Sequence, residues 1–108
     1  MSAMAIDNML TREDLDALPD DGLRHELIDG AFVMTPSPGM GHFDMGAALV
    51  RVLWAAARDT NLKVVYAPFD VALGANVVVP DVLIAPETGF SEKDLPVPPL
   101  LVVEIRSA

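Results

Sequence analysis

Two uninterrupted apolar runs, each carrying one carboxylate, constrain the fold of this chain more than any other feature. Residues 77–84 contain Asp81, and residues 100–105 contain Glu104. Runs of this kind are typical of central strands that are buried on both faces, so we expect both to lie inside a sheet. A charge in such a strand is costly unless it is paired or binds a cation. The two acidic residues therefore need an explanation.

A divalent cation would explain both charges. If the two runs pair, Asp81 and Glu104 can share a face and converge on one ion, with the backbone carbonyl of Ile105 as a further oxygen ligand. Oxygen ligands of this type suit Mg²⁺ or Mn²⁺. In an extended strand Arg106 projects to the same side as Glu104, where it would hold a water nucleophile or offset charge on a phosphate.

Each of these residues also has a purely structural explanation. Asp81 follows Pro80, and a Pro-Asp pair is ordinary turn chemistry that could end a strand. Glu104 could form a salt bridge with Arg106 or another neighbour. Arg106 could be a solvent-facing strand end.

Local signals before the first apolar run predict a short helix followed by a hairpin. Thr11 is placed as an N-cap with Asp14 three residues on, and Pro19 ends the helix within about two turns. Asp29-Gly30 is a strong two-residue turn between expected strands at residues 24–28 and 31–35.

One long helix is predicted from His42 to about Arg58, and it is apolar nearly all round. Such a helix must be covered on more than one side, so we expect a further partner, either a missing segment or another subunit. Two short strands broken at Pro68 should follow.

Several motifs, taken in order, resemble a known family. The segments HELIDGAFVMTPSPGMGH, DVAL, VVVPDVLIAP and PPLLVVEIRS are similar to the Uma-type family of restriction-endonuclease-like bacterial proteins, and the resemblance covers residues 11–107. Pro80-Asp81 followed by Glu104-Ile105-Arg106 resembles the Pro-Asp…(Asp/Glu)-x-Lys signature of the metal-dependent nuclease superfamily. The resemblance implies an α/β restriction endonuclease-like core: a mixed β-sheet, one long helix, and an N-terminal short helix plus β-hairpin.

The resemblance also implies roles for single residues. Asp81 and Glu104 would be the metal ligands. Glu26 and His42 stand where the family usually has Glu and His, so Glu26 would be a further acidic group near the metal and His42 a supporting or substrate contact. The structural alternatives are an ion pair between Glu26 and Arg24 on a wet surface and a helix-capping role for His42.

The chain departs from the family pattern in two ways. Arg106 replaces the superfamily lysine, and a guanidinium cannot lose its proton to act as a general base. The family continues past the final strand into a helix and further strands. We therefore expect residues 1–10 to be an N-terminal tail and residues 11–108 to be a restriction endonuclease-like domain that lacks its C-terminal part.

The amino-acid composition limits which nucleic acids, metals and membranes the chain can bind. The net charge of −9 and a pI near 4.3 argue against tight electrostatic binding to nucleic acid. The chain has no cysteine, which excludes a thiolate metal site and is compatible with a cytoplasmic protein. No apolar run reaches the roughly 18 residues of a membrane span, so we expect no membrane association.

The resemblance implies a Mg²⁺-dependent (or Mn²⁺-dependent) endonuclease that hydrolyses DNA through a metal-activated water. An excess of apolar residues, 52% of the chain, predicts a homodimer or higher homo-oligomer. The alternative is a non-catalytic oligomerisation or protein-binding module derived from the nuclease fold. A hydrolase of small molecules that uses the same metal pair is the third possibility.

Overall fold

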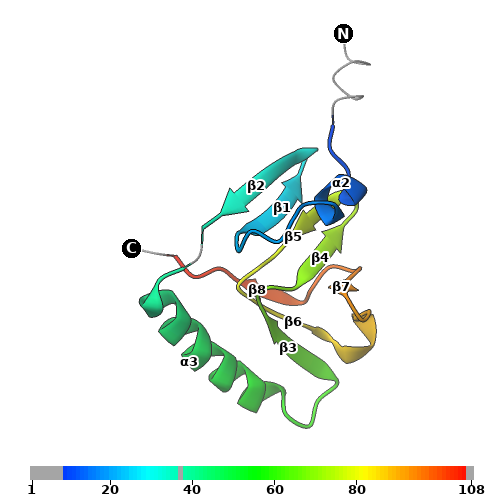
Figure 1. Cartoon of the computed structure of the whole chain (residues 1–108). Helices are drawn as coiled ribbons and strands as arrows, with labels where there is room; N and C mark the ends of the chain where they lie inside the picture. Colours follow the sequence, from blue (N-terminus) through cyan, green and yellow to red (C-terminus); the bar gives the residue numbers. More distant parts are fainter. Residues whose placement is uncertain (1–8, 37, 107–108) are drawn as a thin grey trace.

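The computed structural model describes residues 9–36 and 38–106, in which a short and a long helix are each followed by β-strands (Figure 1). The expected tail lies outside the described residues up to position 8. In chain order the elements are α2 (Arg12–Asp16), β1 (Arg24–Ile28), β2 (Ala31–Thr35), α3 (Met40–Ala57), β3 (Leu62–Tyr66), β4 (Asp70–Leu73), β5 (Asn76–Val78), β6 (Val82–Pro86), the 3₁₀ turn η1 (Glu87–Gly89), β7 (Asp94–Leu95) and β8 (Leu101–Val103).

The predicted α/β class is confirmed, because a short first helix, a hairpin, a long helix and a mixed sheet are all present. The strands divide into two sheets rather than one. A five-stranded sheet has the order β2-β1-β5-β4-β7, in which only the β4–β7 pair is parallel. A three-stranded antiparallel sheet has the order β3-β6-β8.

Local chemistry explains the N-terminal elements, as predicted. The hydroxyl of Thr11 accepts a hydrogen bond from the Asp14 N–H, and the Asp14 carboxylate accepts one from the Thr11 N–H at 2.8 Å. Asp29 and Gly30 have φ values of 51° and 80°, the positive pair that a tight type I′ hairpin turn requires. The turn sets the β1–β2 register, which pairs Arg24 with Thr35.

The first apolar run is not a single strand. β5 ends at Val78 and β6 begins at Val82, and the two strands belong to different sheets. Pro80 lies between them and has no N–H for a strand ladder, so the chain leaves one sheet and enters the other at this point. The Pro80-Asp81 pair therefore acts as a sheet-to-sheet crossing.

The second apolar run pairs with the first, as expected, but it is not buried on both faces. Antiparallel β6–β8 pairing joins Ile84 to Leu101 and Val82 to Val103. β8 lies at the edge of its sheet, and Val102 is 47% exposed. β8 is thus an edge strand with an uncovered apolar surface.

The core lies between strands of both sheets. Val71 of β4, Leu83 and Ala85 of β6 and Leu95 of β7 form one buried cluster. The rings of Phe69 and Phe90 pack beside it in a tilted arrangement. A smaller cluster joins α2 to the hairpin sheet through Leu15, Leu27 and Val77.

The long helix α3 begins two residues before the predicted start and contacts β3 (Figure 1). Its apolar residues continue onto the side that faces solvent, where Val52 is 66% and Trp54 71% exposed. No helix within residues 9–36 and 38–106 is long and apolar enough to cross a bilayer.

Candidate active site

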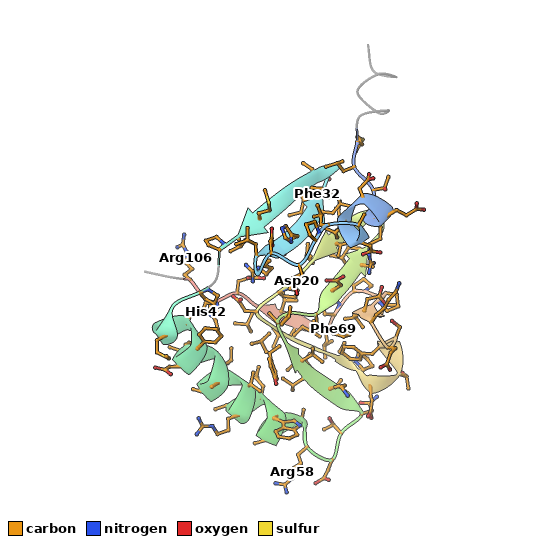
Figure 2. The ribbon with its side chains drawn as sticks, in the orientation of Figure 1. Asp20, Phe32, His42, Arg58, Phe69 and Arg106 are labelled. Atoms are coloured by element: carbon orange, nitrogen blue, oxygen red, sulfur yellow. The ribbon has the colours of Figure 1, made fainter. Side chains whose placement is uncertain are left out.

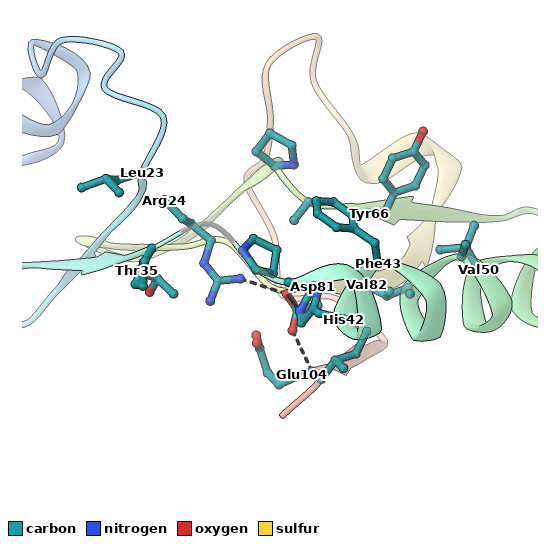
Figure 3. A pocket seen from close by; sticks show the side chains of 18 of the residues that line it. Leu23, Arg24, Thr35, His42, Phe43, Val50, Tyr66, Asp81, Val82 and Glu104 are labelled. Atoms are coloured by element: carbon teal, nitrogen blue, oxygen red, sulfur yellow. Dashed lines mark hydrogen bonds and ion pairs between the residues drawn. The ribbon is translucent and has the colours of Figure 1, made fainter. Parts of the chain in front are cut away.

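The β6–β8 register brings the two predicted metal ligands to one end of the sheet. Val82 pairs with Val103, so Asp81 and Glu104 are the next residues outward on the two chains. Residues opposite one another in an antiparallel pair project to the same face. Figure 3 shows the side chain of Asp81 with Glu104 beside it at the wall of a pocket.

Asp81 is buried, and both its carboxylate oxygens have partners. Oδ1 accepts a hydrogen bond from Arg24 Nη1 at 3.0 Å and lies 3.1 Å from Nε2 of His42. Oδ2 accepts a hydrogen bond from the Ile105 N–H at 2.7 Å. Burial raises the pKa of the Asp81 carboxyl, but the contacts with Ile105, His42 and Arg24 outweigh burial and hold the pKa below its ordinary value. Asp81 is therefore ionised at neutral pH without a bound cation.

The pKa of Glu104 is shifted in the opposite direction, above its ordinary value. Loss of solvation raises its pKa first, and the charge of Asp81, a hydrogen bond with Asp81 and the charge of Glu26 raise it further. The positive charge of Arg24 lowers it but does not compensate. Adjacent carboxylates with pKa values pushed apart are typical of functional sites.

Glu26 joins the same group from β1. Its Oε2 accepts a hydrogen bond from the buried Val79 N–H at 2.7 Å, which holds the crossing segment before Asp81. The alternative ion pair with Arg24 is wrong, because the guanidinium of Arg24 turns to Asp81 instead. Glu26 thus lies inside the acidic group, close enough to raise the pKa of Glu104.

His42 reaches Asp81 from the first turn of α3. The capping role considered for it is wrong, because Gly39 is the N-cap residue and, among the described residues, no side chain forms a capping hydrogen bond at this helix end. Figure 3 shows the His42 ring directed at Asp81. The long helix therefore contributes a polar side chain to the site as well as apolar ones to the pocket.

The structure does not bring Arg106 into the group. β8 ends at Val103, so the strand alternation that would place Arg106 beside Glu104 stops before it. Its side chain is exposed and extends away from the ribbon (Figure 2). The N–H of Ile105 contacts Asp81, while the carbonyl of Ile105 stays a predicted metal ligand.

Arg24 is the member that the sequence-based reasoning missed as part of the site. It is separated from Asp81 by 57 residues, and the pair forms only because β1 of one sheet lies beside the entrance to β6 of the other. The one usable signal was the alternation of β1, which places Arg24 and Glu26 on the same face.

The group lies in the wall of a cavity of about 1360 Å³ between α3 and the ends of β3 and β6. The cavity lining is mainly apolar and includes the rings of Phe43, Trp54 and Tyr66. A few polar groups in a large apolar cavity are typical of a ligand site.

The donor set fits a hard divalent cation in part. No three His, Cys, Asp or Glu side chains form a ready metal cage within residues 9–36 and 38–106. Mg²⁺, however, is usually held by one or two carboxylates together with waters and substrate oxygens. Asp81 and Glu104 supply such a pair, and a cation would relieve the repulsion that raises the pKa of Glu104.

Comparisons with known proteins bear on the family and the fold of the chain. A family model, Uma2, described as "Putative restriction endonuclease", matches residues 12–108. A crystal structure from Anabaena variabilis, described as a putative nuclease belonging to DUF820, superposes with a TM-score of 0.74 and 18% sequence identity. The superposition covers 91% of this chain but 59% of that one, so the chain spans less than two thirds of that chain's length. No curated protein matches the sequence significantly.

Proposed function

The chain belongs to the Uma2 family, and from this premise we propose that it is a magnesium-dependent endonuclease that hydrolyses phosphodiester bonds in DNA. The observation that supports the proposal best is the pair of carboxylates, Asp81 and Glu104, at the shared end of β6 and β8. Residues 11–108 are the proposed nuclease domain.

Asp81 and Glu104 are the proposed ligands of the ion, with the carbonyl of Ile105 as a further oxygen. When bound, Mg²⁺ or Mn²⁺ makes water more acidic and offsets the negative charge that develops on a phosphate. Asp81 enters this role already ionised, because its neighbours hold its pKa low.

The surrounding residues have supporting roles in the proposal. His42 keeps Asp81 in one orientation, and Glu26 fixes the segment before it while adding negative charge near the centre. Arg106 stays protonated, so it neutralises or orients a phosphate from the exposed chain end instead of removing a proton. The net charge of −9 gives DNA no general electrostatic attraction, so the ion must provide the attraction for the phosphate.

Calorimetric titration of Mg²⁺ and Mn²⁺ into the wild type, Glu104→Ala and Glu92→Ala tests the site. Glu92 is an exposed glutamate outside the pocket lining, so Glu92→Ala is the control for lost charge. We expect saturable binding to the wild type and to Glu92→Ala, and none to Glu104→Ala. Absence of binding to a folded wild type would reject the proposal.

Activity assays then separate the substrates. Metal-dependent cleavage of plasmid DNA that is lost in Glu104→Ala supports the endonuclease. Cleavage of only a small chromogenic phosphodiester supports the small-molecule hydrolase that uses the same metal pair.

A second candidate function is supported by the exposed apolar surface. Val52 and Trp54 of α3, with Leu101 and Val102 of β8, are between 45% and 71% exposed. Large exposed apolar patches mark interaction surfaces. A non-catalytic oligomerisation or protein-binding module would assemble with concentration and be indifferent to Mg²⁺.

A further inference from the structure

The guanidinium of Arg24 lies beside the carboxylate of Asp81, where a bound cation would be expected. Its Nη1 lies 3.0 Å from Oδ1 of Asp81, and its positive charge also acts on Glu104. Among the described residues it is the only Lys or Arg that forms an ion pair with a carboxylate of this group. The metal-free centre therefore already contains one permanent positive charge.

The contacts of the guanidinium are incomplete. Nε of Arg24 is buried and has no hydrogen-bond partner among the described residues. A buried donor without a partner is unfavourable, so this pose depends on attraction to the carboxylates rather than on a full set of hydrogen bonds. A cation that replaced the guanidinium at Asp81 would therefore break an ion pair but not a complete set of hydrogen bonds.

We propose that Arg24 is the internal counter-cation of the carboxylate centre and that a divalent cation must displace its guanidinium from Asp81 to bind. This inference rests on the proposed function, since it concerns the same metal site. Arg24 is a positioning residue: it acts through Asp81, neutralises the metal-free centre and lowers the affinity for the ion. The affinity is then set by competition between two cations for Oδ1.

Competition between the guanidinium and a divalent cation for Asp81 makes a prediction that a purely structural role for Arg24 does not. Replacing Arg24 should weaken the metal-free fold and, at the same time, tighten divalent-cation binding. Loss of a unit charge a few ångströms from the ion should lower the Kd for Mn²⁺ by about tenfold in Arg24→Gln. Arg24→Lys keeps the charge and should stay close to the wild type.

The experiment is calorimetry with Mn²⁺ on the wild type, Arg24→Gln, Arg24→Lys and Arg58→Gln at one ionic strength. Arg58→Gln is the matched control, because it makes the same chemical change at the opposite end of α3 from His42 (Figure 2). Its Kd should remain within about twofold of the wild type, since exposed charges at long range are screened.

Thermal unfolding of the metal-free proteins measures how much Arg24 stabilises the fold. Arg24→Gln should lower the Tm by roughly 5–10 °C, because it leaves Asp81 buried without its cationic partner. Adding Asp81→Asn to Arg24→Gln should restore most of that loss. Additive effects of the two substitutions would contradict the counter-cation role without any use of metal.

The outcomes separate this inference from the proposed function. Binding to the wild type with equal or weaker binding to Arg24→Gln overturns the inference and leaves the metal site standing. Absence of binding to both folded proteins overturns the inference together with the proposed site. If Arg24→Gln does not fold, the Nε–H resonance of Arg24 in the wild type serves instead. That resonance should shift with saturating Mg²⁺ while that of Arg58 does not, and an unshifted Arg24 resonance overturns the inference.

Discussion

Arg12 holds three carboxylates at the end of the molecule away from the proposed active site. Its guanidinium lies 3.2 Å from Asp16, 3.4 Å from Asp70 and 3.3 Å from Asp94. Asp70 and Asp94 face each other in the parallel β4–β7 pair, so their repulsion requires a nearby cation. This cluster joins the first helix to the five-stranded sheet.

The Asp94 carboxyl should make the fold sensitive to acid. A hydrogen bond from Ser91 lowers the pKa of Asp94, burial raises it, and Arg12 lowers it further. The net result is a pKa below the ordinary value of 3.8. A group with a lowered folded pKa stabilises the fold above its unfolded pKa, and the stabilisation is lost as pH falls through the folded value. We expect Asp94→Asn to be less stable than the wild type at pH 7, with the difference shrinking below about pH 4.

Urea unfolding of both proteins at several pH values between 2 and 7 measures the difference. Asp70 acts in the opposite direction, because burial raises its pKa and the charge of Asp94 raises it further. Asp94→Asn removes that second contribution, so the variant should be compared with the wild type at each pH and not at one pH alone. Glu92→Gln, two residues from Asp94 and exposed, should show no such pH-dependent difference. A constant difference between wild type and Asp94→Asn across the whole range would contradict the assignment.

The residue scale also shows what sequence could and could not predict about the site. The proximity of Asp81 and Glu104 could be predicted, because one carboxylate in each of two apolar runs is conspicuous in the sequence. The ion pairs Arg24–Asp81 and Arg12–Asp94 could not, because they join residues 57 and 82 positions apart through the packing of elements. A distant ion pair leaves no local pattern.

At the scale of elements, the hairpin turn is the most sensitive position that local chemistry identifies. Gly30 has φ of 80°, and a Cβ placed there would lie 2.7 Å from the Met9 side chain. Gly30→Ala should lower the free energy of unfolding by about 1–3 kcal/mol, because the left-handed backbone is strained for alanine. Chemical denaturation measures the loss.

Gly41→Ala is the control for that substitution. Gly41 lies in the first turn of α3 with nothing within 4 Å of the added Cβ. Alanine is the better helix former by up to about 1 kcal/mol, so this variant should be as stable as the wild type or more so. Equal losses in both variants would reject the turn-strain explanation.

Elements with local signals were predicted well, and those decided by packing were not. The capping box of α2 and the β1–β2 turn were correct because the responsible residues lie within a few positions of one another. The division of residues 77–84 between two sheets was missed, because an apolar run has the same appearance in one strand or two.

At the scale of the whole molecule, the exposed apolar side chains of α3 should drive association. Trp54 is 71% exposed, and Val52 and Phe43 lie on the same helix with 66% and 58% exposure. We expect sedimentation velocity to show mass increasing with concentration and Trp54→Gln to reduce it, since burial of an aromatic ring contributes strongly at interfaces.

Met34→Gln is the matched control for association. Met34 is 59% exposed on β2, in the hairpin rather than on α3. It should leave the association unchanged. A wild type that stays monomeric at all concentrations would contradict the role of the α3 surface.

The order in which the site residues occur along the chain has a consequence for protein synthesis. Arg24 and Asp81 leave the ribosome before Glu104, which follows β8, the last strand of its sheet. A nascent chain can therefore form the Arg24–Asp81 pair while the second carboxylate is still absent. Until Glu104 emerges, the pair is neutral and cannot hold a cation by two ligands. Under the proposed function, the carboxylate pair is therefore complete only after Glu104 has emerged from the ribosome.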